Sequence, residues 1–311
     1  MSKATRNLLL VAGALILIGA ILGGTGYWMG GMKAVRLTGG GPVVIDSASG
    51  FLNAVDRQWE DLDGLDIDVD LLELSMVEGD AFSLTGSYDP GLTDFDISEE
   101  KGVLVIRSTD RHTPWWGFGQ WGFGLPFGGI YEPKMVFTYP KGTRFEDVSV
   151  KSSLGSFHME GLRAERLAVA LDLGNLTGQD IAVEAFDARM SLGNCELDRL
   201  EVAKGAEIHM DGGNLRLDDA AIAGLSSTSN LGNFDFSGVL SGTADIAMDL
   251  GALDMALGIP ENRIAYSIEC DLGSSTLNGR HLGSSAHSNV ASPELTLEVR
   301  TNLGSVEIRA D

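Results

Sequence analysis

A Leu-Gly step, replaced once by Gly-Gly, recurs along the second half of this 311-residue chain at a nearly constant spacing. The glycines of the first six steps are 19, 19, 20, 19 and 19 residues apart, and two wider steps follow. These glycines are Gly155, Gly174, Gly193, Gly213, Gly232 and Gly251, then Gly273 and Gly304. A fixed period of this length is typical of stacked coils that bury their apolar faces against one another. The period therefore predicts a fold class, although it indicates no reaction.

Apolar and polar residues alternate on both sides of each corner glycine. The positions two residues after the glycines are apolar and are expected to point inward. They are Phe157, Leu176, Cys195, Leu215, Phe234, Leu253 and Val306. A period of two is the pattern of a half-buried strand, and a second alternating run precedes each glycine. We therefore expect an all-β fold, a parallel β-solenoid with right-handed winding and 19–20 residues per coil.

Polar residues at the corner are expected to stack along the solenoid axis as well. Asn follows the glycine in four consecutive repeats, at Asn175, Asn194, Asn214 and Asn233, where side-chain amides can form a ladder. The position two before the glycine mostly alternates between Asp and a neutral residue, which limits repulsion between stacked carboxylates. A cation-binding acidic column is the alternative interpretation. The Gly-Gly-x-Gly-x-Asp pattern of calcium-binding β-rolls is missing, which favours turn capping.

Charge and cysteine content limit the function classes. Asp and Glu total 44 against 22 Lys and Arg, a net charge of −22, which argues against nucleic acid as a partner. Cys195 and Cys270 are expected four coils apart, beyond the reach of a disulfide. We predict that both are free thiols used as small apolar residues.

Residues 1–36 are predicted to form a single-pass membrane anchor with its flanks. No charged residue occurs between Arg6 and Lys33, and residues 7–29 supply the roughly 20 apolar residues that span a bilayer. A cleaved signal peptide is the alternative, but no Ala-x-Ala site follows the apolar run. Only six residues precede the apolar run, and the large part of the chain that follows it is acidic. Both features favour localisation at the cell membrane with the solenoid outside the cytoplasm. The reverse orientation stays open because the basic flanks are balanced.

Composition divides the rest of the chain into three regions. Residues 37–60 are predicted to be a linker, and residues 51–62, which overlap its end, are the nearest candidate for a short helix or a loop. Residues 61–150 are predicted to be an irregular β capping region, and residues 151–311 the regular solenoid repeats.

The last alternating run ends at Asp311, the final residue of the sequence. If the coils stack in chain order, this run forms an edge of the solenoid. Glu307, Arg309 and Asp311 are then expected to blunt that edge against further strand pairing, and the alternative is that a second copy of the chain stacks there.

An aromatic, glycine-rich insertion at residues 113–129 interrupts the capping region. It is a candidate interaction surface that would contact a membrane interface or a partner, or else a lid that buries its own aromatic side chains over the solenoid. Its candidate contact residues are Trp115, Trp116, Phe118, Trp121, Phe123 and Phe127.

Motifs that carry catalytic or metal chemistry are missing from the sequence. The five histidines share no metal-ligand spacing, and His158 and His209 fall on positions expected to face solvent. We expect no cofactor and no metal. The weaker candidate site is the excursion at residues 278–293, with Arg280, His281 and His287, for which a flexible polar loop is the alternative.

Residues 60–311 resemble the bacterial "putative adhesin" β-strand-repeat domain family, a family of unknown function found in membrane-anchored envelope proteins. The segments that carry the resemblance are residues 79–84, 102–106, 136–140 and 301–308, together with the Leu-Gly-Asn/Ser steps. The resemblance supplies no catalytic residues, and it implies that some members accompany envelope-stress regulatory systems.

Three functional hypotheses follow. The first is a membrane-anchored, extracytoplasmic, non-enzymatic binding or scaffold protein of the bacterial envelope. Its partner would be an envelope protein or a cell-wall polymer. The second is an accessory regulator of an envelope-stress signalling system. The third is a carbohydrate-active enzyme built on a β-helix, which the tight coils disfavour.

Overall fold

The computed structural model describes residues 34–38, 41–45, 52–88, 93–109 and 133–311. Strands β1 (Ala34–Thr38) and β2 (Gly41–Ile45) pair antiparallel and belong to a compact unit of their own. The predicted membrane anchor lies outside the described residues. Within the described ranges, no helix has the length and apolar character needed to cross a membrane.

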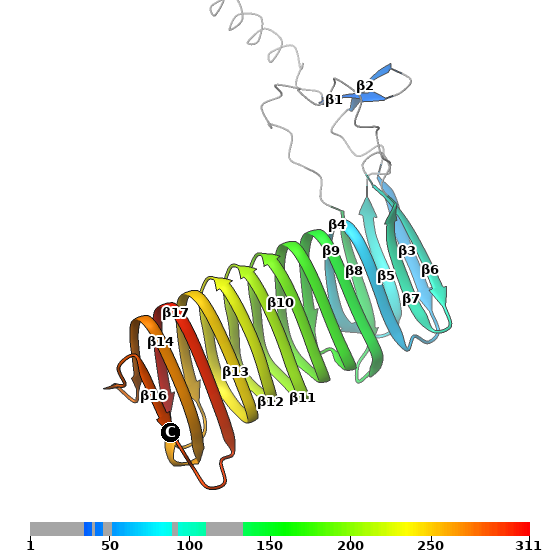
Figure 1. The fold of residues 1–311 in the computed structure, drawn as a ribbon. Coiled ribbons are helices and arrows are strands. Elements are labelled where there is room, and N and C mark those ends of the chain that lie inside the picture. The colour runs from blue at the N-terminus through cyan, green and yellow to red at the C-terminus, as the bar shows by residue number, and fades with distance from the viewer. Residues whose placement is uncertain (1–33, 39–40, 46–51, 89–92, 110–132) are drawn as a thin grey trace, which may run out of the picture. The chain divides into compact units, whose positions relative to one another are not determined.

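The second unit is a stack of parallel coils, as the repeat predicts (Figure 1). Long strands continue through the corners at Gly155, Gly174, Gly251, Gly273 and Gly304, whereas Gly193, Gly213 and Gly232 lie between strands. Equivalent positions of neighbouring coils pair in parallel register, for example Leu173 with Leu154. The coils are formed by β4 (Gly64–Gly79), β9 (Phe145–Glu160), β10 (Arg163–Leu192), β11 (Cys195–Gly212), β12 (Leu215–Leu231), β13 (Phe234–Leu257), β14 (Ile264–Leu277) and β17 (Leu295–Ala310).

Close backbone approach explains why the corner requires glycine. A Cβ atom built on Gly193 would lie 1.6 Å from the carbonyl oxygen of Gly174, and one on Gly213 would lie 1.6 Å from that of Gly193. Any side chain there would collide with the coil below, so the glycines form a continuous column. In the first coil Leu72 takes the corner position, beneath Gly155.

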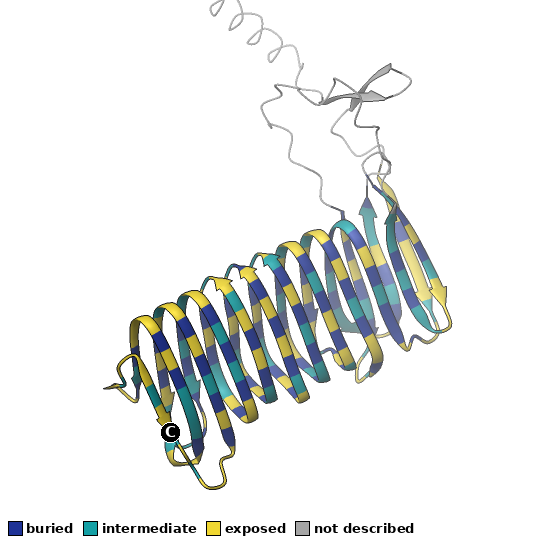
Figure 2. Ribbon diagram, in the orientation of Figure 1, coloured by how far each residue is buried: buried dark blue, intermediate teal, exposed yellow. Residues whose placement is uncertain are grey.

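The core lies inside the coils and follows the predicted alternation (Figure 2). All seven positions two residues after the glycines are buried, including Phe157, Cys195 and Phe234. The predicted asparagine ladder is present too. Asn175 Oδ1 accepts a hydrogen bond from the backbone N–H of Asn194 at 3.1 Å, and Asn194 Oδ1 accepts one from that of Asn214 at 3.2 Å.

The N-terminal end of the stack is closed by shorter strands that pair mostly antiparallel. On one face β8 and β5 extend the sheet from β4 to the edge strand β3, and on the other face β7 extends it to β6. Their bounds are β3 (Asn53–Trp59), β5 (Phe82–Tyr88), β6 (Asp94–Glu100), β7 (Val103–Thr109) and β8 (Lys134–Pro140).

This arrangement corrects the prediction of a linker at residues 37–60 with a helix or loop at residues 51–62. Residues 53–59 form β3, which pairs antiparallel with β5 from Asn53–Tyr88 to Trp59–Phe82. The segment shows little alternation because β3 is an edge strand with mostly exposed side chains. The linker prediction failed because composition does not distinguish an exposed edge strand from a linker.

The C-terminal coils do not stack in chain order. Strand β17 lies between β13 and β14 and pairs in parallel with both, so Gly304 stacks on Gly251 and Gly273 stacks on Gly304. After β13, a 3-10 turn (Glu261–Arg263) leads into β14 at the outer position, and the chain later returns to fill the gap.

The predicted edge at the end of the chain is therefore wrong. Glu307 and Arg309 belong to an internal strand, and Arg309 binds Asp254 of β13 at 2.5 Å. The outer strand is β14, onto which β15 (Arg280–His281) and β16 (Ser285–Ser288) pair antiparallel. Both cysteines are free and buried, as predicted, although β17 places one more coil between them than chain order would.

Candidate binding grooves along the solenoid

In the middle coils of the stack, the chain bends at a β-bulge ahead of the long run that leads to the corner glycine. The register shifts at this bend, between Val183 and Ala185 where β10 pairs with β11 and between Val202 and Ala206 where β11 pairs with β12. The bulge accommodates Lys204, the extra residue that makes one repeat interval 20 residues long instead of 19. Bulges of this kind redirect a strand without ending its pairing.

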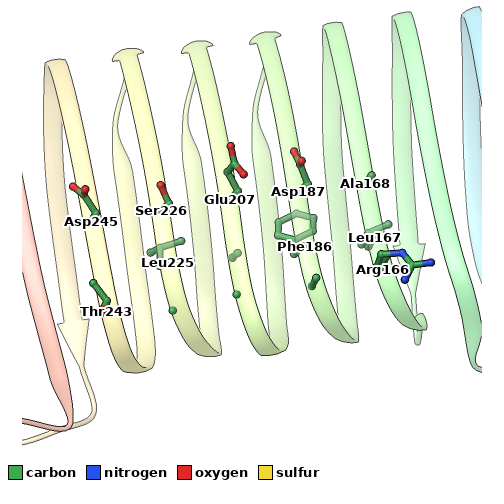
Figure 3. A pocket seen from close by; sticks show the side chains of 14 residues that line it. Arg166, Leu167, Ala168, Phe186, Asp187, Glu207, Leu225, Ser226, Thr243 and Asp245 are labelled. Carbon is green, nitrogen blue, oxygen red and sulfur yellow. The ribbon is translucent and has the colours of Figure 1, made fainter.

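Small residues stack at the bend and leave a groove that crosses several coils (Figure 3). Ala185, Gly205 and Gly224 occupy the same position in three successive coils. Buried side chains, including Phe186 and Leu225, lie directly beside them. The groove has a volume of about 700 Å³ and a mostly apolar lining. We call it the axial groove.

Charged side chains form the rim of the axial groove. Asp187, Glu207 and Asp245 lie along one side of it, and Arg166 lies at its end near β9 (Figure 3). Arg166 binds Asp147 of the preceding coil through two hydrogen bonds, which raise the pKa of the guanidinium.

The acidic rim is partly neutralised by arginines from the same face. Arg189 Nη2 lies 3.0 Å from Asp187 and 3.6 Å from Glu207, and Arg300 Nη1 lies 3.3 Å from Asp245. These pairs are solvent-exposed, so each contributes little to stability but fixes the direction of its charges.

A second, smaller groove of about 430 Å³ lies on the other side of the bend. Glu184 sits at its centre, with Oε1 2.6 Å from Arg144 Nη2 and Oε2 2.5 Å from Lys204 Nζ. Hydrogen bonds and charge attraction, from Lys204 first and then Arg144, hold the pKa of Glu184 below its ordinary value. The Glu184 carboxylate therefore stays ionised near neutral pH and keeps its ion pairs with Arg144 and Lys204.

The chemistry of both grooves suits binding. Their charged groups are exposed and paired, and they sit on rigid strands at a constant axial repeat. Among the described residues, no group of three or more His, Cys, Asp or Glu side chains is placed to hold a metal ion. An elongated ligand could contact equivalent positions of several coils at once.

The candidate contact residues of the aromatic insertion, Trp115 to Phe127, lie outside the described residues. The flanking strands show where the insertion joins the solenoid. Asp68 of β4 pairs with Arg107, two residues before the end of β7, and Glu73 pairs with Lys134, the first residue of β8.

The structure does not assemble the three candidate residues of the excursion at residues 278–293. Arg280 and His281 form β15, opposite Leu277 and Thr276, beyond the glycine corner of β14. His287 lies in β16 opposite Ser267, on the run before that corner. Arg280 is held by Glu261 at 2.7 Å, and this hydrogen bond raises the pKa of its guanidinium.

The excursion is thus partly built into the sheet, through β15 and β16, and its remaining residues form turns and loops. Its two short strands pair with β14, the outer strand of the stack. The two remaining histidines of the solenoid form axial contacts. His158 Nδ1 lies 3.0 Å from Thr177 Oγ1, and His209 Nδ1 lies 2.6 Å from Thr228 Oγ1, all at exposed positions or positions close to the surface.

Glycine-cornered parallel coils with a continuous internal core define a β-solenoid. Within this class, the chain belongs to the Toastrack DUF4097 family, which it matches over residues 64–308. This membership confirms the predicted resemblance to the "putative adhesin" repeat family.

Comparison with solved structures matches the chain to proteins described as adhesins or adhesion proteins. A "putative adhesin" from Bacteroides fragilis is 10% identical, with 84% of this chain and 98% of that chain covered and a TM-score of 0.40. A "putative cell adhesion protein" from Clostridium sporogenes is 10% identical, with 84% and 99% covered and a TM-score of 0.29. A "putative adhesin" from Parabacteroides distasonis is 9% identical, with 83% and 97% covered and a TM-score of 0.34. No curated protein sequence matches the chain.

Proposed function

We propose that this protein is a non-enzymatic binding or scaffold module of the bacterial cell envelope, tethered to the membrane by residues 7–29 with the solenoid outside the cytoplasm. The observation that carries the proposal is the axial groove, an open surface groove with a mostly apolar lining and a charged rim that crosses successive coils. Its partner is an elongated envelope polymer, such as a cell-wall glycan strand, or an extended segment of an envelope protein. The aromatic residues Trp115 to Phe127 supply a second contact surface.

Repetition supports this proposal. Neighbouring coils present the same groove position at intervals of about 4.8 Å, so a polymer that binds one coil can bind the next without a change of direction. Each contact can be weak, because linked contacts raise the apparent affinity. The apolar run of residues 7–29, with no acidic or basic residue inside it, supports the membrane tether.

Co-sedimentation tests the binding function. The full chain in detergent is mixed with purified cell-wall sacculi, and the pelleted fraction is measured against a detergent-only control. We expect saturable co-sedimentation without release of soluble sugar fragments. Release of fragments would indicate an enzyme, and the absence of co-sedimentation at any concentration would remove the cell-wall polymer as the partner.

Protease treatment of intact cells tests the orientation. The proposal predicts that the solenoid is digested from outside the membrane while a cytoplasmic control protein survives. A fully protected solenoid would overturn the exported orientation. Extraction of the full chain by alkaline carbonate would overturn the membrane anchor.

A further inference from the structure

The last part of the chain, residues 264–311, forms a unit whose strands pair mainly with one another. Strand β14 carries β15 and β16 on its outer side and β17 on its inner side, and within the described part of the chain it pairs with no other strand. The unit is attached to the coil below through β17, which pairs with β13 from Gly242–Leu295 to Leu257–Ala310. We call residues 264–311 the C-terminal unit.

A single short connection joins the C-terminal unit to the rest of the chain. Residues 258–263 leave the end of β13, pass through the 3-10 turn and enter β14 at the outer position. The strand that follows β13 in sequence is therefore not the strand that pairs with it. Fully extended, six residues span about 20 Å. The connection is thus long enough for the unit to leave its own β13 and pair with the β13 of an adjacent copy.

Charged side chains match β17 to the strand on which it lies. Arg300 Nη1 lies 3.3 Å from Asp245 Oδ1, and Arg309 Nη2 lies 2.5 Å from Asp254 Oδ1. These ion pairs are exposed, so they specify the register more than they add to stability. The β13 strand of a second copy presents the same two carboxylates at the same spacing, so it is an equally good partner for β17.

The inner face of β17 contains an imperfect contact. The side chain of Thr301 is buried, in line with Met248 of β13 and Cys270 of β14. Within the described part of the chain, Thr301 Oγ1 has no hydrogen-bond partner. A buried hydroxyl without a partner costs free energy, and this cost is relieved when the unit separates from β13 and water reaches the hydroxyl. The C-terminal unit is therefore attached less tightly than an apolar residue at this position would allow.

We propose that the C-terminal unit is exchanged between two copies of this chain, so that β17 of each copy pairs with β13 of the other. The occupant of the new interface is the strand already seen on β13, supplied by a second chain. All contacts between β13 and β17 are kept in the exchanged pair, and the connection at residues 258–263 is the segment that changes conformation. Exchange requires no membrane tether, although two copies in one membrane would meet more often.

Mixing two cysteine variants of the full chain tests the exchange. Leu253 and Val306 are buried and directly paired across β13 and β17. A disulfide between Leu253→Cys in one chain and Val306→Cys in another therefore requires exchange. The two purified proteins are incubated together in detergent at high protein concentration and then oxidised, with the wild-type chain as the background for Cys195 and Cys270. We expect a disulfide-linked dimer with one chain of each kind, in an amount that rises with incubation time.

Two matched mixtures define what is exchanged. Leu217→Cys and Phe236→Cys are buried and paired across β12 and β13, within the stack, and are expected to give no mixed dimer. Ile268→Cys and Val299→Cys are paired across β14 and β17, and they are also expected to give none because the unit moves as one body. A dimer in the first mixture would indicate general unfolding and contradict the proposal. A dimer in the second would show that β17 moves alone, which would overturn exchange of the whole unit.

A single chain that carries both Leu253→Cys and Val306→Cys provides the geometric control. It should close an intramolecular disulfide in dilute solution and keep the circular dichroism of the wild-type chain. If this disulfide closes and the mixture of single variants still yields only monomers, the proposal is wrong. If the buried substitutions prevent folding, Leu250→Cys and Leu303→Cys replace them, because these residues are exposed and pair across the same two strands.

The rate of exchange tests the role of the buried hydroxyl. Thr301→Val, introduced into both cysteine variants, removes the unpartnered hydroxyl and keeps the shape of the side chain. We expect the mixed dimer to form about ten-fold more slowly. Thr301→Ser keeps the hydroxyl and is expected to exchange at least as fast as the parent pair. Equal rates for Thr301→Val and the parent pair would contradict a weakened contact between β17 and β13.

Discussion

Asn302 donates a hydrogen bond from Nδ2 to Asp249 Oδ1 at 2.7 Å across 53 residues of sequence. The contact exists because β17 lies between β13 and β14. In chain order, Asp249 and Asp271 would stack as neighbouring carboxylates. With β17 inserted, Asn302 separates them, and acidic and neutral residues alternate along this column from Asp70 to Asp271. The observed order of the coils therefore keeps carboxylates apart along this column, which chain order would not do.

The first prediction concerns this column. Asn302→Asp would stack three carboxylates and remove the hydrogen bond, so we expect the free energy of unfolding to fall by about 1 kcal/mol at pH 7. The part of the loss that comes from repulsion should shrink at high salt, which screens exposed charges. The matched control is Asn302→Ser, because Ser already occupies this column at Ser153 and Ser191. Urea unfolding at low and high salt measures the difference, and an equal loss in both variants would rule out charge as the cause.

The order of the C-terminal coils gives the second prediction. Leu250 pairs with Leu303, and Leu303 pairs with Leu272, so Leu250 and Leu272 are two coils apart. Neighbouring coils are within the Cα separation that a disulfide spans, whereas alternate coils at about 9.6 Å are not. Oxidation of monomeric chains should therefore close a disulfide in Leu250→Cys, Leu303→Cys and not in Leu250→Cys, Leu272→Cys. The reverse result, read by peptide mapping, would restore the chain-order stack.

The third prediction tests the glycine column. Gly193→Ala places a Cβ 1.6 Å from the carbonyl oxygen of Gly174 in the middle of the stack. The coils would have to separate, and we expect a loss of about 4 kcal/mol or more. Gly205→Ala is the control, since its Cβ would approach nothing closer than 3.9 Å, and it should change stability by less than about 1 kcal/mol. Thermal unfolding that does not separate the two variants would contradict close backbone approach as the reason for the repeat.

The fourth prediction concerns pH. Burial raises the pKa of the Cys195 thiol to about 12, whereas an exposed thiol ionises near 8.5. Between these values the unfolded chain loses this proton and the folded chain keeps it, so stability is full below about pH 8.5 and falls as the pH rises. At pH 10 the single thiol accounts for about 2 kcal/mol.

Cys195→Ala should remove this part of the alkaline destabilisation while lowering stability at pH 7 through lost packing. Denaturant unfolding of both proteins between pH 7 and pH 10 measures the two slopes. Identical slopes would show that the folded thiol ionises freely.

The coils could be predicted from the sequence because each structural role recurs at a fixed distance in sequence from the corner glycine. Gly193 is required by the close approach of two backbones, Phe157 and Cys195 fill the core, and Asn194 belongs to the stacked amides. The position of β17 could not be predicted from this period, because a glycine stacks equally well on any other coil. The irregular alternation of Asp249, Asp271 and Asn302 in chain order was the available signal.

The axial groove was not predicted, because the glycines at the bend were not recognised as a second column of small residues. Ala185, Gly205 and Gly224 lie within paired strands, where small residues resemble ordinary strand positions. The extra residue in the one 20-residue interval, together with small side chains at one offset, could have indicated a bulge there. The two short strands of the excursion at residues 278–293 were not predicted, because their pairing partner, β14, lies at the edge only when β17 occupies the inner position.

Binding in the axial groove is the central claim and is tested most directly by filling the groove. Gly205→Leu projects a side chain into the axial groove from a position with open space above its backbone. Ala170→Leu adds the same side chain to the same face of the solenoid, outside the axial groove. In co-sedimentation of the full chain with cell-wall sacculi, we predict about a ten-fold loss of affinity for Gly205→Leu and wild-type affinity for Ala170→Leu. Equal affinity of all three proteins would contradict binding through the axial groove.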